Sequence, residues 1–485
     1  MAAVREALYE AALAKIRATK TGAGPSNTQE AGSAPFLDVL VKICNRLVPV
    51  DFELLAQLPP GESLKLKHYI VCTVQEVLRA ANELDCGLCV HHDFLYVYNG
   101  EYWQMVDRGV LQRYFSLCAE RLGVDQITAR YHRFSEELCK QFFALAYLPK
   151  PLRGAEPVLI NLKNGTFEIC RTDRRLRPFH PGDFMTYQLP FGYDQEVPAP
   201  QWLAFLNEVL PDKTQQDILA EYIGYVFAKH LKLEKTLFLY GTGANGKSVV
   251  FEVINALLGR ENVSNYSLES LNEPYYRAMI EDKLLNYSSE ISSRIQADRF
   301  KQLTSGEAIE ARLPYGKPRI IEGYARLAFN CNDLPRDIEH TEAYFRRFLI
   351  LMFVIKIHED RRDPQLARKI IESELAGVFN WALQGLERLL ANGDFTPSET
   401  VERALETYRR ESDSVAMFVD EEGYTPDREE TDYESLKDLH KAYREYCLDA
   451  GYKGVGRSTF RKRLEGLGFE TRRRGRGFIV FLVRD

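Results

Sequence analysis

Apolar and polar positions follow a helical period over much of the region from residue 36 to about 150. LKHYIVCTVQEVLRAANEL, at residues 66–84, repeats apolar side chains every three or four positions, which is typical of an amphipathic helix. Aromatic-rich runs on both sides of Asn99-Gly100 interrupt this pattern. Asn-Gly suits the positive φ angles of a type I′ turn, so the sequence predicts a β-hairpin there and a second one around Asn164-Gly165.

A different pattern begins near residue 235. Short apolar runs alternate with helical segments up to about residue 355, as expected for a parallel sheet whose strands are joined by crossover helices. The strand candidates are KTLFLY, KLLNYSS, YARLAFN and FRRFLILMFV. We therefore predict an α/β fold for this region, followed by helices over residues 364–411.

Local composition suggests where the chain divides. Residues 21–35 are rich in Gly, Ser, Ala and Pro and indicate a linker behind a short amphipathic helix. Prolines between 188 and 211 mark a second boundary, and the acidic run DEEGYTPDREETD at 420–432 indicates another linker. The predicted domains are residues 1–35, 36–200, 201–415 and 430–485.

The overall composition is that of an ordinary globular protein. Of 485 residues, 45% are hydrophobic and 27% charged. The net charge of −6 excludes a protein that is basic throughout, so any nucleic-acid contact must come from local basic patches. No apolar run approaches the ~20 residues that span a bilayer, and MAAVREALYEAALAKIRATK lacks the apolar core of a secretory signal. We expect a cytoplasmic location and no membrane partner.

The nine cysteines show no framework spacing, and their odd number favours reduced thiols. One cluster, CGLCVHH, contains Cys86, Cys89, His91 and His92 and could supply half a zinc site. No second pair with suitable spacing accompanies it, so a packed turn is the favoured interpretation.

The strongest motif is GTGANGKS, which satisfies the pattern G-x-x-x-x-G-K-[ST]. Glycines allow backbone N–H groups to close around phosphate oxygens, and the following helix adds its positive dipole. Lys247 would neutralise the β- and γ-phosphates of ATP and Ser248 would ligate Mg²⁺. A coincidental turn is disfavoured, because an apolar strand precedes the motif and an amphipathic helix follows it. The predicted nucleotide-binding residues are Gly241, Thr242, Gly243, Ala244, Asn245, Gly246, Lys247, Ser248 and Val249.

Hydrolysis needs further groups that orient water and neutralise charge. Glu290 ends the strand KLLNYSSEI, where a general base or a Mg²⁺-organising carboxylate belongs. Asn330 and Asn332 end the next strand and could hydrogen-bond the γ-phosphate and the attacking water. Arg346 and Arg347 enter an apolar strand, and one of them could act on the ATP of a neighbouring subunit. The alternatives are a surface glutamate, asparagines that cap a strand end, and a structural ion pair.

In this order and at this spacing, the motifs resemble those of superfamily 3 helicases. They are most similar to the helicase portion of phage, plasmid and poxvirus primase-helicases, over roughly residues 90–485. The shared pattern consists of GANGKS, a strand ending in Glu, FKQLTSGEAIEARLPYG, NDLP and the arginine pair.

The resemblance implies an AAA+-type P-loop ATPase over residues 201–415 behind a mixed α+β collar region over residues 36–200. It also implies a ring, usually a hexamer, that moves 3′ to 5′ along one DNA strand. In this family Lys247 and Ser248 would be the Walker A pair, Glu290 the Walker B acid, Asn332 sensor 1, and Arg346 or Arg347 the trans-acting finger. Ser289 stands where many P-loop ATPases have Asp, which leaves the second Mg²⁺-organising group unassigned.

A hairpin is predicted around Tyr315-Gly316-Lys317, with Lys317 and Arg319 near its tip. The resemblance implies that it lines a central channel. Basic side chains there would bind DNA phosphates, and Tyr315 could stack on bases. The alternative is an exposed hairpin with ordinary solubilising charge.

The last residues predict a small basic module. A helix closed by Gly451 precedes RSTFRKRLEGLG, for which Ser458 is the predicted N-cap. FETRRRGRGFIVFLV then predicts two strands joined by an arginine-rich turn, so the module indicates a winged helix-turn-helix. A basic protein-docking or regulatory module is the alternative. The candidate DNA contacts are Arg461, Lys462, Arg472, Arg473, Arg474 and Arg476.

These features together predict an ATP-dependent replicative DNA helicase of a mobile element, acting on single-stranded and forked DNA. The C-terminal module could recognise origin duplex DNA. The sequence shows no convincing acidic motif of a primase active site and no zinc ribbon built from two CxxC motifs. We therefore expect a separate primase or polymerase. The alternatives are an origin-binding initiator that uses its ATPase as an assembly switch, and an AAA+ protein remodeller.

Overall fold

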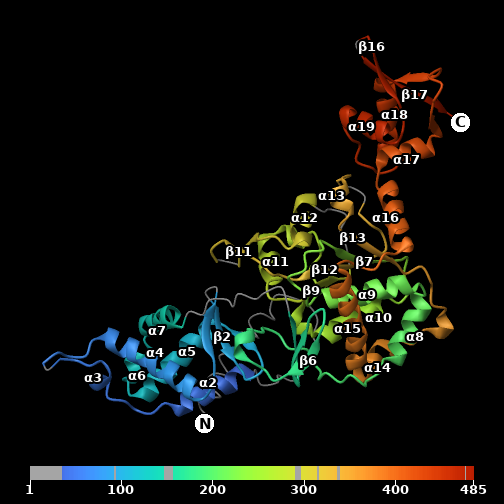
Figure 1. The fold of residues 1–485 in the computed structure, drawn as a ribbon. Helices are drawn as coiled ribbons and strands as arrows, with labels where there is room; N and C mark the ends of the chain where they lie inside the picture. Colours follow the sequence, from blue (N-terminus) through green and yellow to red (C-terminus); the bar gives the residue numbers. More distant parts are fainter. Residues whose placement is uncertain are drawn as a thin grey trace. The chain divides into compact units, whose positions relative to one another are not determined.

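The computed structural model describes residues 35–59, 61–91, 94–146, 157–289, 296–313, 316–335, 339–475 and 477–484 (Figure 1). Within these ranges no helix is long and apolar enough to cross a membrane. The chain forms two compact units. The first contains the described residues up to Ile169 together with Asp173–Tyr193, and the second contains Cys170–Thr172 and Asp194 onward. The predicted segment 1–35 falls almost wholly outside the described residues.

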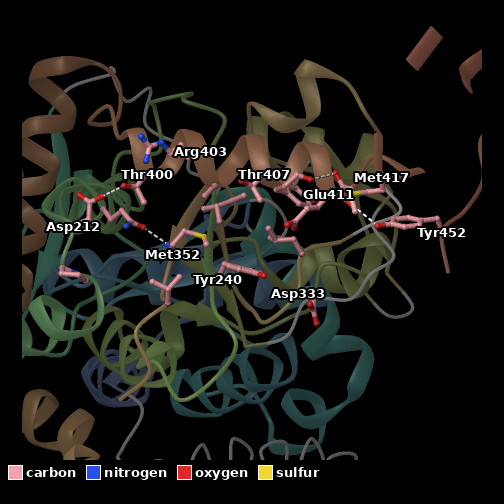
Figure 2. Close-up of a pocket in the computed structure, with 18 of the residues that line it drawn as sticks. Asp212, Tyr240, Asp333, Met352, Thr400, Arg403, Thr407, Glu411, Met417 and Tyr452 are labelled. Atoms are coloured by element: carbon pink, nitrogen blue, oxygen red, sulfur yellow. Dashed lines mark hydrogen bonds between the residues drawn. The ribbon is translucent and has the colours of Figure 1, made fainter. Parts of the chain in front are cut away.

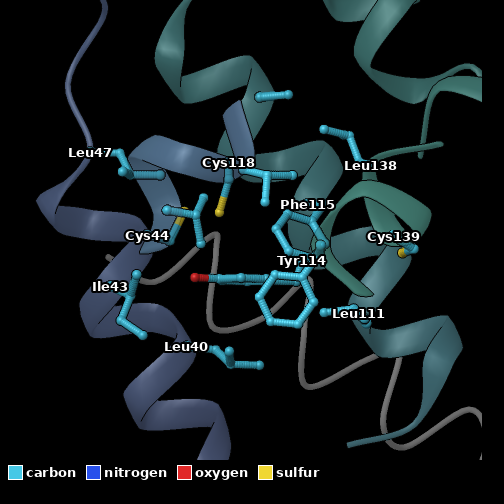
Figure 3. Packing of buried hydrophobic residues seen from close by; sticks show 14 of the residues in the cluster. Leu40, Ile43, Cys44, Leu47, Leu111, Tyr114, Phe115, Cys118, Leu138 and Cys139 are labelled. Carbon is cyan, nitrogen blue, oxygen red and sulfur yellow. The ribbon is translucent and has the colours of Figure 1, made fainter. Parts of the chain in front are cut away.

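The first unit is mainly helical, as predicted. Its helices pack around a core to which α2, α5 and α7 contribute large apolar side chains. Figure 3 shows Leu40 and Ile43 of α2 beside Tyr114 and Phe115 of α5, with Leu138 of α7 close to them. The helices are α2 (Pro35–Arg46), α3 (Phe52–Leu55), α4 (Leu66–Glu83), α5 (Arg108–Leu122), α6 (Gln126–Arg130) and α7 (His132–Leu145).

Both predicted hairpins are confirmed, but the type I′ turn is wrong for each. In the first, Tyr98 pairs with Trp103, so four residues form the loop. Asn99 Oδ1 accepts the N–H groups of Glu101 at 2.9 Å and Tyr102 at 2.8 Å, an Asx turn that closes the loop through a side chain. In the second, Leu162 pairs with Gly165, so Lys163 and Asn164 form the loop, and neither has the positive φ that a type I′ turn requires. The strands are β1 (Leu88–His91), β2 (Phe94–Tyr98), β3 (Trp103–Val106), β4 (Val158–Leu162), β5 (Gly165–Ile169) and β6 (Arg174–Arg177).

The CxxC pair does not converge on one point. Cys86 belongs to the helical core, whereas Cys89 packs in a separate aromatic cluster with Tyr96 and Trp103. Burial raises the pKa of the Cys89 thiol to about 12, which keeps it neutral. No group of His, Cys, Asp and Glu that could hold a metal is found in the described part of the chain; His92 and the side chain of His91 lie outside it.

The second unit is built on a five-stranded sheet in the order β13-β7-β12-β9-β8, and all four strand pairs are parallel. The prediction of a parallel sheet with crossovers is therefore confirmed. All four predicted strands are present, and the two-residue strand β8 was missed because it is too short to give a pattern. The strands are β7 (Thr236–Tyr240), β8 (Val263–Ser264), β9 (Leu285–Ser288), β12 (Arg326–Cys331) and β13 (Phe348–Met352).

Aromatic side chains pack together on one face of this sheet. Phe238 of β7 stacks on Phe348 of β13 with ring centroids 4.5 Å apart, and Phe300 and Tyr408 close the cluster from α12 and α16. The remaining elements of this part are α8 (Pro200–Val209), α9 (Lys213–Tyr225), α10 (Lys247–Leu258), α11 (Pro274–Met279), α12 (Ala297–Ser305), β10 (Ile309–Ala311), β11 (Arg319–Ile321), α13 (Glu342–Phe345), α14 (Leu366–Ser373), α15 (Leu375–Asn392) and α16 (Glu399–Glu411).

Residues 414–484 form a C-terminal module with its own core of Phe418, Tyr443 and Phe460, among others. The long strand β17 pairs antiparallel with β14, β15 and β16. The elements are α17 (Ser414–Glu421), β14 (Tyr424–Pro426), β15 (Tyr433–Ser435), α18 (Leu436–Asp449), α19 (Arg457–Gly466), β16 (Thr471–Arg474) and β17 (Gly477–Arg484).

Two predictions for this module were wrong. The run 420–432 is not a linker, because Tyr424 is buried in the module core. Its acids have a local role, since Asp427 accepts the N–H groups of Glu429, Thr431 and Asp432 in a tight turn. The N-cap of α19 is Gly456 rather than Ser458.

Candidate active site

The glycine-rich loop lies between the carboxyl end of β7 and the start of α10. Gly243, Ala244 and Gly246 have positive φ angles of 105°, 54° and 85°. A Cβ on Gly241 would come within 2.2 Å of Phe353 O, and one on Gly246 within 2.8 Å of Phe205 Cζ. Because backbone and ring atoms cannot yield by such amounts, the first and last glycines of the motif are needed for packing as well as for conformation.

Lys247 is the first residue of α10 and is buried. Its Nζ donates to Gly241 O at 2.5 Å and to Asn245 Oδ1 at 3.0 Å. Asn245 Nδ2 in turn donates to Phe353 O at 2.5 Å. These acceptors carry no charge, and desolvation lowers the pKa of Lys247. An anion brought to this ammonium group would therefore be stabilised strongly.

A cavity of about 530 Å³ opens in front of the loop. Parallel pairing brings the carboxyl ends of β7, β12 and β9 to the same edge of the sheet, so residues distant in sequence meet there. The predicted loop residues and Asn332 thus share one cavity, whereas Gly241, Thr242 and Val249 do not line it. The lining consists of Gly243, Ala244, Asn245, Gly246, Lys247, Ser248, Ser289, Asn330, Cys331, Asn332 and Asp333.

The two asparagines of β12 and the loop after it differ in environment. Asn330 is buried, and its Oδ1 accepts a hydrogen bond from Tyr287 Oη at 2.8 Å. Asn332 is exposed at the cavity wall. Asn332 is therefore the amide that a ligand in the cavity can reach without breaking an internal hydrogen bond.

The predicted acid Glu290 lies outside the described residues. Ser289, the residue before it, lines the cavity. Cys331 lies on the same wall, where burial raises the pKa of its thiol to about 12 and keeps it neutral.

The arginine pair lies at the opposite edge of the sheet. Arg347 O accepts the N–H of Thr236, the first residue of β7, at 2.8 Å, whereas the glycine-rich loop follows the last residue of that strand. Both arginines form ion pairs with Glu234 of the same chain. Within a single copy, the arginines thus form the ion pair that was the alternative interpretation, and they do not enter the cavity.

Asp333 also lines a second cavity, of about 800 Å³. Figure 2 shows residues that line this second cavity. Its walls include Tyr240, Met352 and α16. Thr400 Oγ1 donates to Asp212 Oδ2 at 2.6 Å, and Met352 N donates to Gln215 Oε1 at 2.7 Å, which ties α9 to α16 and β13. Sequence reasoning missed this cavity because its lining comes from widely separated segments without a motif.

The predicted hairpin exists as the antiparallel pair of β10 and β11. Lys317 is exposed in its loop, and Tyr315 lies outside the described residues. Arg319 lies next to the loop, in the last pair of the ladder opposite Ala311, but its guanidinium forms an ion pair with Glu281.

The basic residues of the C-terminal module divide into two groups. Arg461 lies over the Phe478 ring at 4.2 Å, Arg474 lies over Tyr433 at 5.0 Å, and Arg472 forms ion pairs with Glu430 and Glu470. These three therefore contribute to internal contacts. Lys462 and Arg473 are exposed, and Arg476 lies outside the described residues.

Three family models match the chain. The model described as "D5 N terminal like" matches residues 75–211, and "Poxvirus D5 protein-like" matches residues 410–479. Between them, "Family of unknown function (DUF5906)" matches residues 239–347, which include the glycine-rich loop, Asn332 and the arginine pair.

Two viral proteins are similar over the larger part of the chain. "Putative helicase L207/L206" of Acanthamoeba polyphaga mimivirus is 24% identical over 277 residues, which are 53% of this chain and 28% of the viral protein. "Putative helicase 121R" of Invertebrate iridescent virus 3 is 22% identical over 325 residues, 59% of this chain and 34% of the viral protein. The chain spans about a third or less of the length of these relatives.

Among solved structures, the A-form apo structure of the NrS-1 C-terminal region is similar at a TM-score of 0.46 and 14% identity, covering 85% of this chain and 99% of that chain. The two D5 models match either side of the glycine-rich loop region, and viral proteins named as helicases align with the chain. The two D5 matches and the viral relatives support the resemblance of the chain to D5-like primase-helicases.

Proposed function

We propose that this chain is the ATP-hydrolysing motor of a replicative DNA helicase from a phage, plasmid or other mobile element. The observation that carries the proposal is the single cavity lined by both the glycine-rich loop and Asn332, which come from strands far apart in sequence. A coincidental turn would have no reason to face an exposed amide from a neighbouring strand.

The residues present fit ATP and Mg²⁺. Backbone N–H groups of Gly243–Ser248 and the buried ammonium of Lys247 would hold the β- and γ-phosphates. Ser248 Oγ and Glu290 would hold Mg²⁺, which supplies neutralising charge for phosphoryl transfer when bound. Asn332 would orient the attacking water and contact the γ-phosphate. The parallel sheet with this loop after β7 supports an AAA+-type P-loop ATPase.

The arginine positions support a site shared between copies. β7 has five residues, so at ~3.3 Å per residue the arginine edge lies roughly 17 Å from the loop. Arg346 or Arg347 can therefore act only on ATP bound to another copy. This favours a homo-oligomeric ring, and a hexamer is the proposed form.

Two surfaces would contact DNA. Lys317 in the β10–β11 loop would bind phosphates of the translocated single strand. In the C-terminal module, α17, α18 and α19 with the β16–β17 hairpin support a winged helix-turn-helix, with Lys462 on the recognition helix α19 and Arg473 on the wing. Origin recognition would use this module, and priming would come from a separate primase or polymerase.

The deciding experiment measures ATP hydrolysis with and without single-stranded DNA, beside unwinding of a tailed fork. Stimulated hydrolysis with unwinding supports the motor. ATP-dependent binding to duplex DNA without strand separation would instead favour an origin-binding initiator that uses its ATPase as an assembly switch. Hydrolysis that ignores DNA would favour an AAA+ protein remodeller.

A further inference from the structure

One carboxylate oxygen serves both arginines of the pair. Glu234 Oε2 lies 2.8 Å from Nη2 of Arg346 and 2.8 Å from Nη2 of Arg347. Charge-assisted contacts of this length are among the stronger hydrogen bonds in proteins. Among these three side chains, one carboxylate between two guanidinium groups leaves one positive charge in excess.

The backbone around Glu234 is shaped to make these contacts. Glu234 has a φ of +54°, a conformation that costs a non-glycine residue ~1–2 kcal/mol. Its neighbours are bonded on both sides: Leu233 N donates to Tyr225 Oη at 3.2 Å, and Lys235 Nζ donates to Arg346 O at 2.7 Å. An unfavourable backbone conformation that its surroundings maintain commonly marks a functional position.

The two arginines are not equivalent. The Arg347 side chain is only 8% exposed, its Nη1 donates to Ala343 O, and desolvation lowers its pKa despite the charge of Glu234. The Arg346 side chain is 55% exposed. The excess positive charge therefore lies on Arg346, at the surface.

We infer that Glu234 is a positioning residue for catalysis: it fixes Arg347 inside the subunit and holds Arg346 outward, toward the nucleotide of the neighbouring copy. The inference rests on the proposed function, because it requires an ATP site shared between copies. It names Arg346, and not Arg347, as the arginine that acts in trans.

Glu234→Gln tests the inference, because it removes the charge and keeps the size of the side chain. An arginine that has lost its orientation should lower kcat by about a hundredfold, while KM and the Kd for ATP stay within about twofold because the trans arginine acts on the hydrolysis step. Glu342→Gln is the matched control. Glu342 lies on α13 and forms an ion pair with Arg409 at 2.6 Å, so loss of the Glu342 charge should leave kcat unchanged.

Mixed assemblies show where Glu234 acts. Lys247→Ala copies have no hydrolysis of their own but carry an intact Glu234 and Arg346. If Glu234 positions a trans-acting arginine, adding these copies to the Glu234→Gln variant should restore turnover. The ATP would be hydrolysed at the intact glycine-rich loop of a Glu234→Gln copy, with Arg346 supplied by a neighbouring Lys247→Ala copy. A merely structural role would not be rescued. The double variant Glu234→Gln with Arg346→Ala should be no slower than Arg346→Ala alone.

Normal kcat in Glu234→Gln, loss without rescue at any mixing ratio, or additive losses in the double variant would each overturn the inference and leave the proposed function intact. If Glu234→Gln fails to fold, Arg346→Ala takes its place in the mixing experiment, and full activity of that variant overturns the inference. Wild-type protein that does not hydrolyse ATP would instead overturn the proposed function and the inference with it.

Discussion

Tyr287 donates a hydrogen bond from its buried Oη to Asn330 Oδ1 at 2.8 Å, linking β9 to β12 beneath the cavity. The bond gives Asn330 a structural role and leaves Asn332, two residues on, as the amide at the cavity wall. The two asparagines, indistinguishable by type, should therefore respond differently to the same substitution.

Asn330→Ala should lower stability. The change leaves Tyr287 Oη buried without its acceptor, which costs about 1–3 kcal/mol. Urea unfolding of the wild type and the variant measures the loss. Tyr287→Phe combined with Asn330→Ala should cost less than Asn330→Ala alone, since no buried hydroxyl is then left unsatisfied.

Asn332→Ala should lower turnover and leave stability nearly unchanged. Removal of a group that contacts the reacting phosphate or water typically costs about 10²–10³ in kcat. Steady-state ATP hydrolysis and a thermal unfolding scan on the same sample check both halves of the prediction. A fall in Tm similar to that of Asn330→Ala, with normal kcat, would reassign Asn332 to a structural role.

Lys247→Ala should abolish hydrolysis, because the buried ammonium is the cation that the loop presents to the cavity. ATP turnover and binding of a fluorescent nucleotide provide the measurements. Lys229→Ala is a suitable control, since its Nζ contacts backbone oxygens remote from the loop. Wild-type turnover by the Lys247 variant would refute the assignment of the loop.

Lys317→Ala and Arg319→Ala separate DNA contact from hairpin anchoring. Loss of Lys317 should weaken single-strand binding and reduce the slope of log K against log salt by about 0.7, with basal ATPase retained. Loss of Arg319 breaks the ion pair with Glu281, so it should destabilise the hairpin and lower the Tm. Titrations of single-stranded DNA at several salt concentrations test the first variant; loss of its basal ATPase would point to a structural role instead.

The junction between α16 and α17 should weaken in acid. His340 Nε2 bonds Ser412 O at 2.8 Å, and burial lowers the pKa of His340, with the charge of Asp413 only partly opposing this. Because the folded-state pKa lies below the unfolded value of about 6.5, the folded state is destabilised as the pH falls through about 6.5 and below.

Chemical unfolding at pH values from about 7.5 to about 5, a range that brackets the unfolded histidine pKa, checks the prediction. His340→Gln keeps a donor for Ser412 O and cannot titrate, so its stability should fall less with acid than that of the wild type. Equal pH dependence in both proteins would show that His340 does not control the junction.

The strand ends and the loop could be predicted because parallel strands bring their carboxyl ends to one edge, so Lys247 and Asn332 had to lie close together. The contacts of the arginines could not be predicted, since Glu234 lies 112 residues from Arg346 and carries no motif. The pattern of apolar and polar residues also does not predict local side-chain contacts. Asn99 closes its turn through its own Oδ1, and Tyr424 is buried although it lies within the acidic run at 420–432.

Strand β17 also constrains when the C-terminal module can fold during synthesis. Since β14, β15 and β16 all take their hydrogen-bonded partner from this one strand, none of them has a partner until β17 has been synthesised. Helices α17, α18 and α19 must therefore wait with an open apolar face while the chain grows, whereas the parallel sheet of residues 236–352 can already close. A ribosome-bound chain would carry a closed parallel sheet ahead of an unfinished C-terminal module.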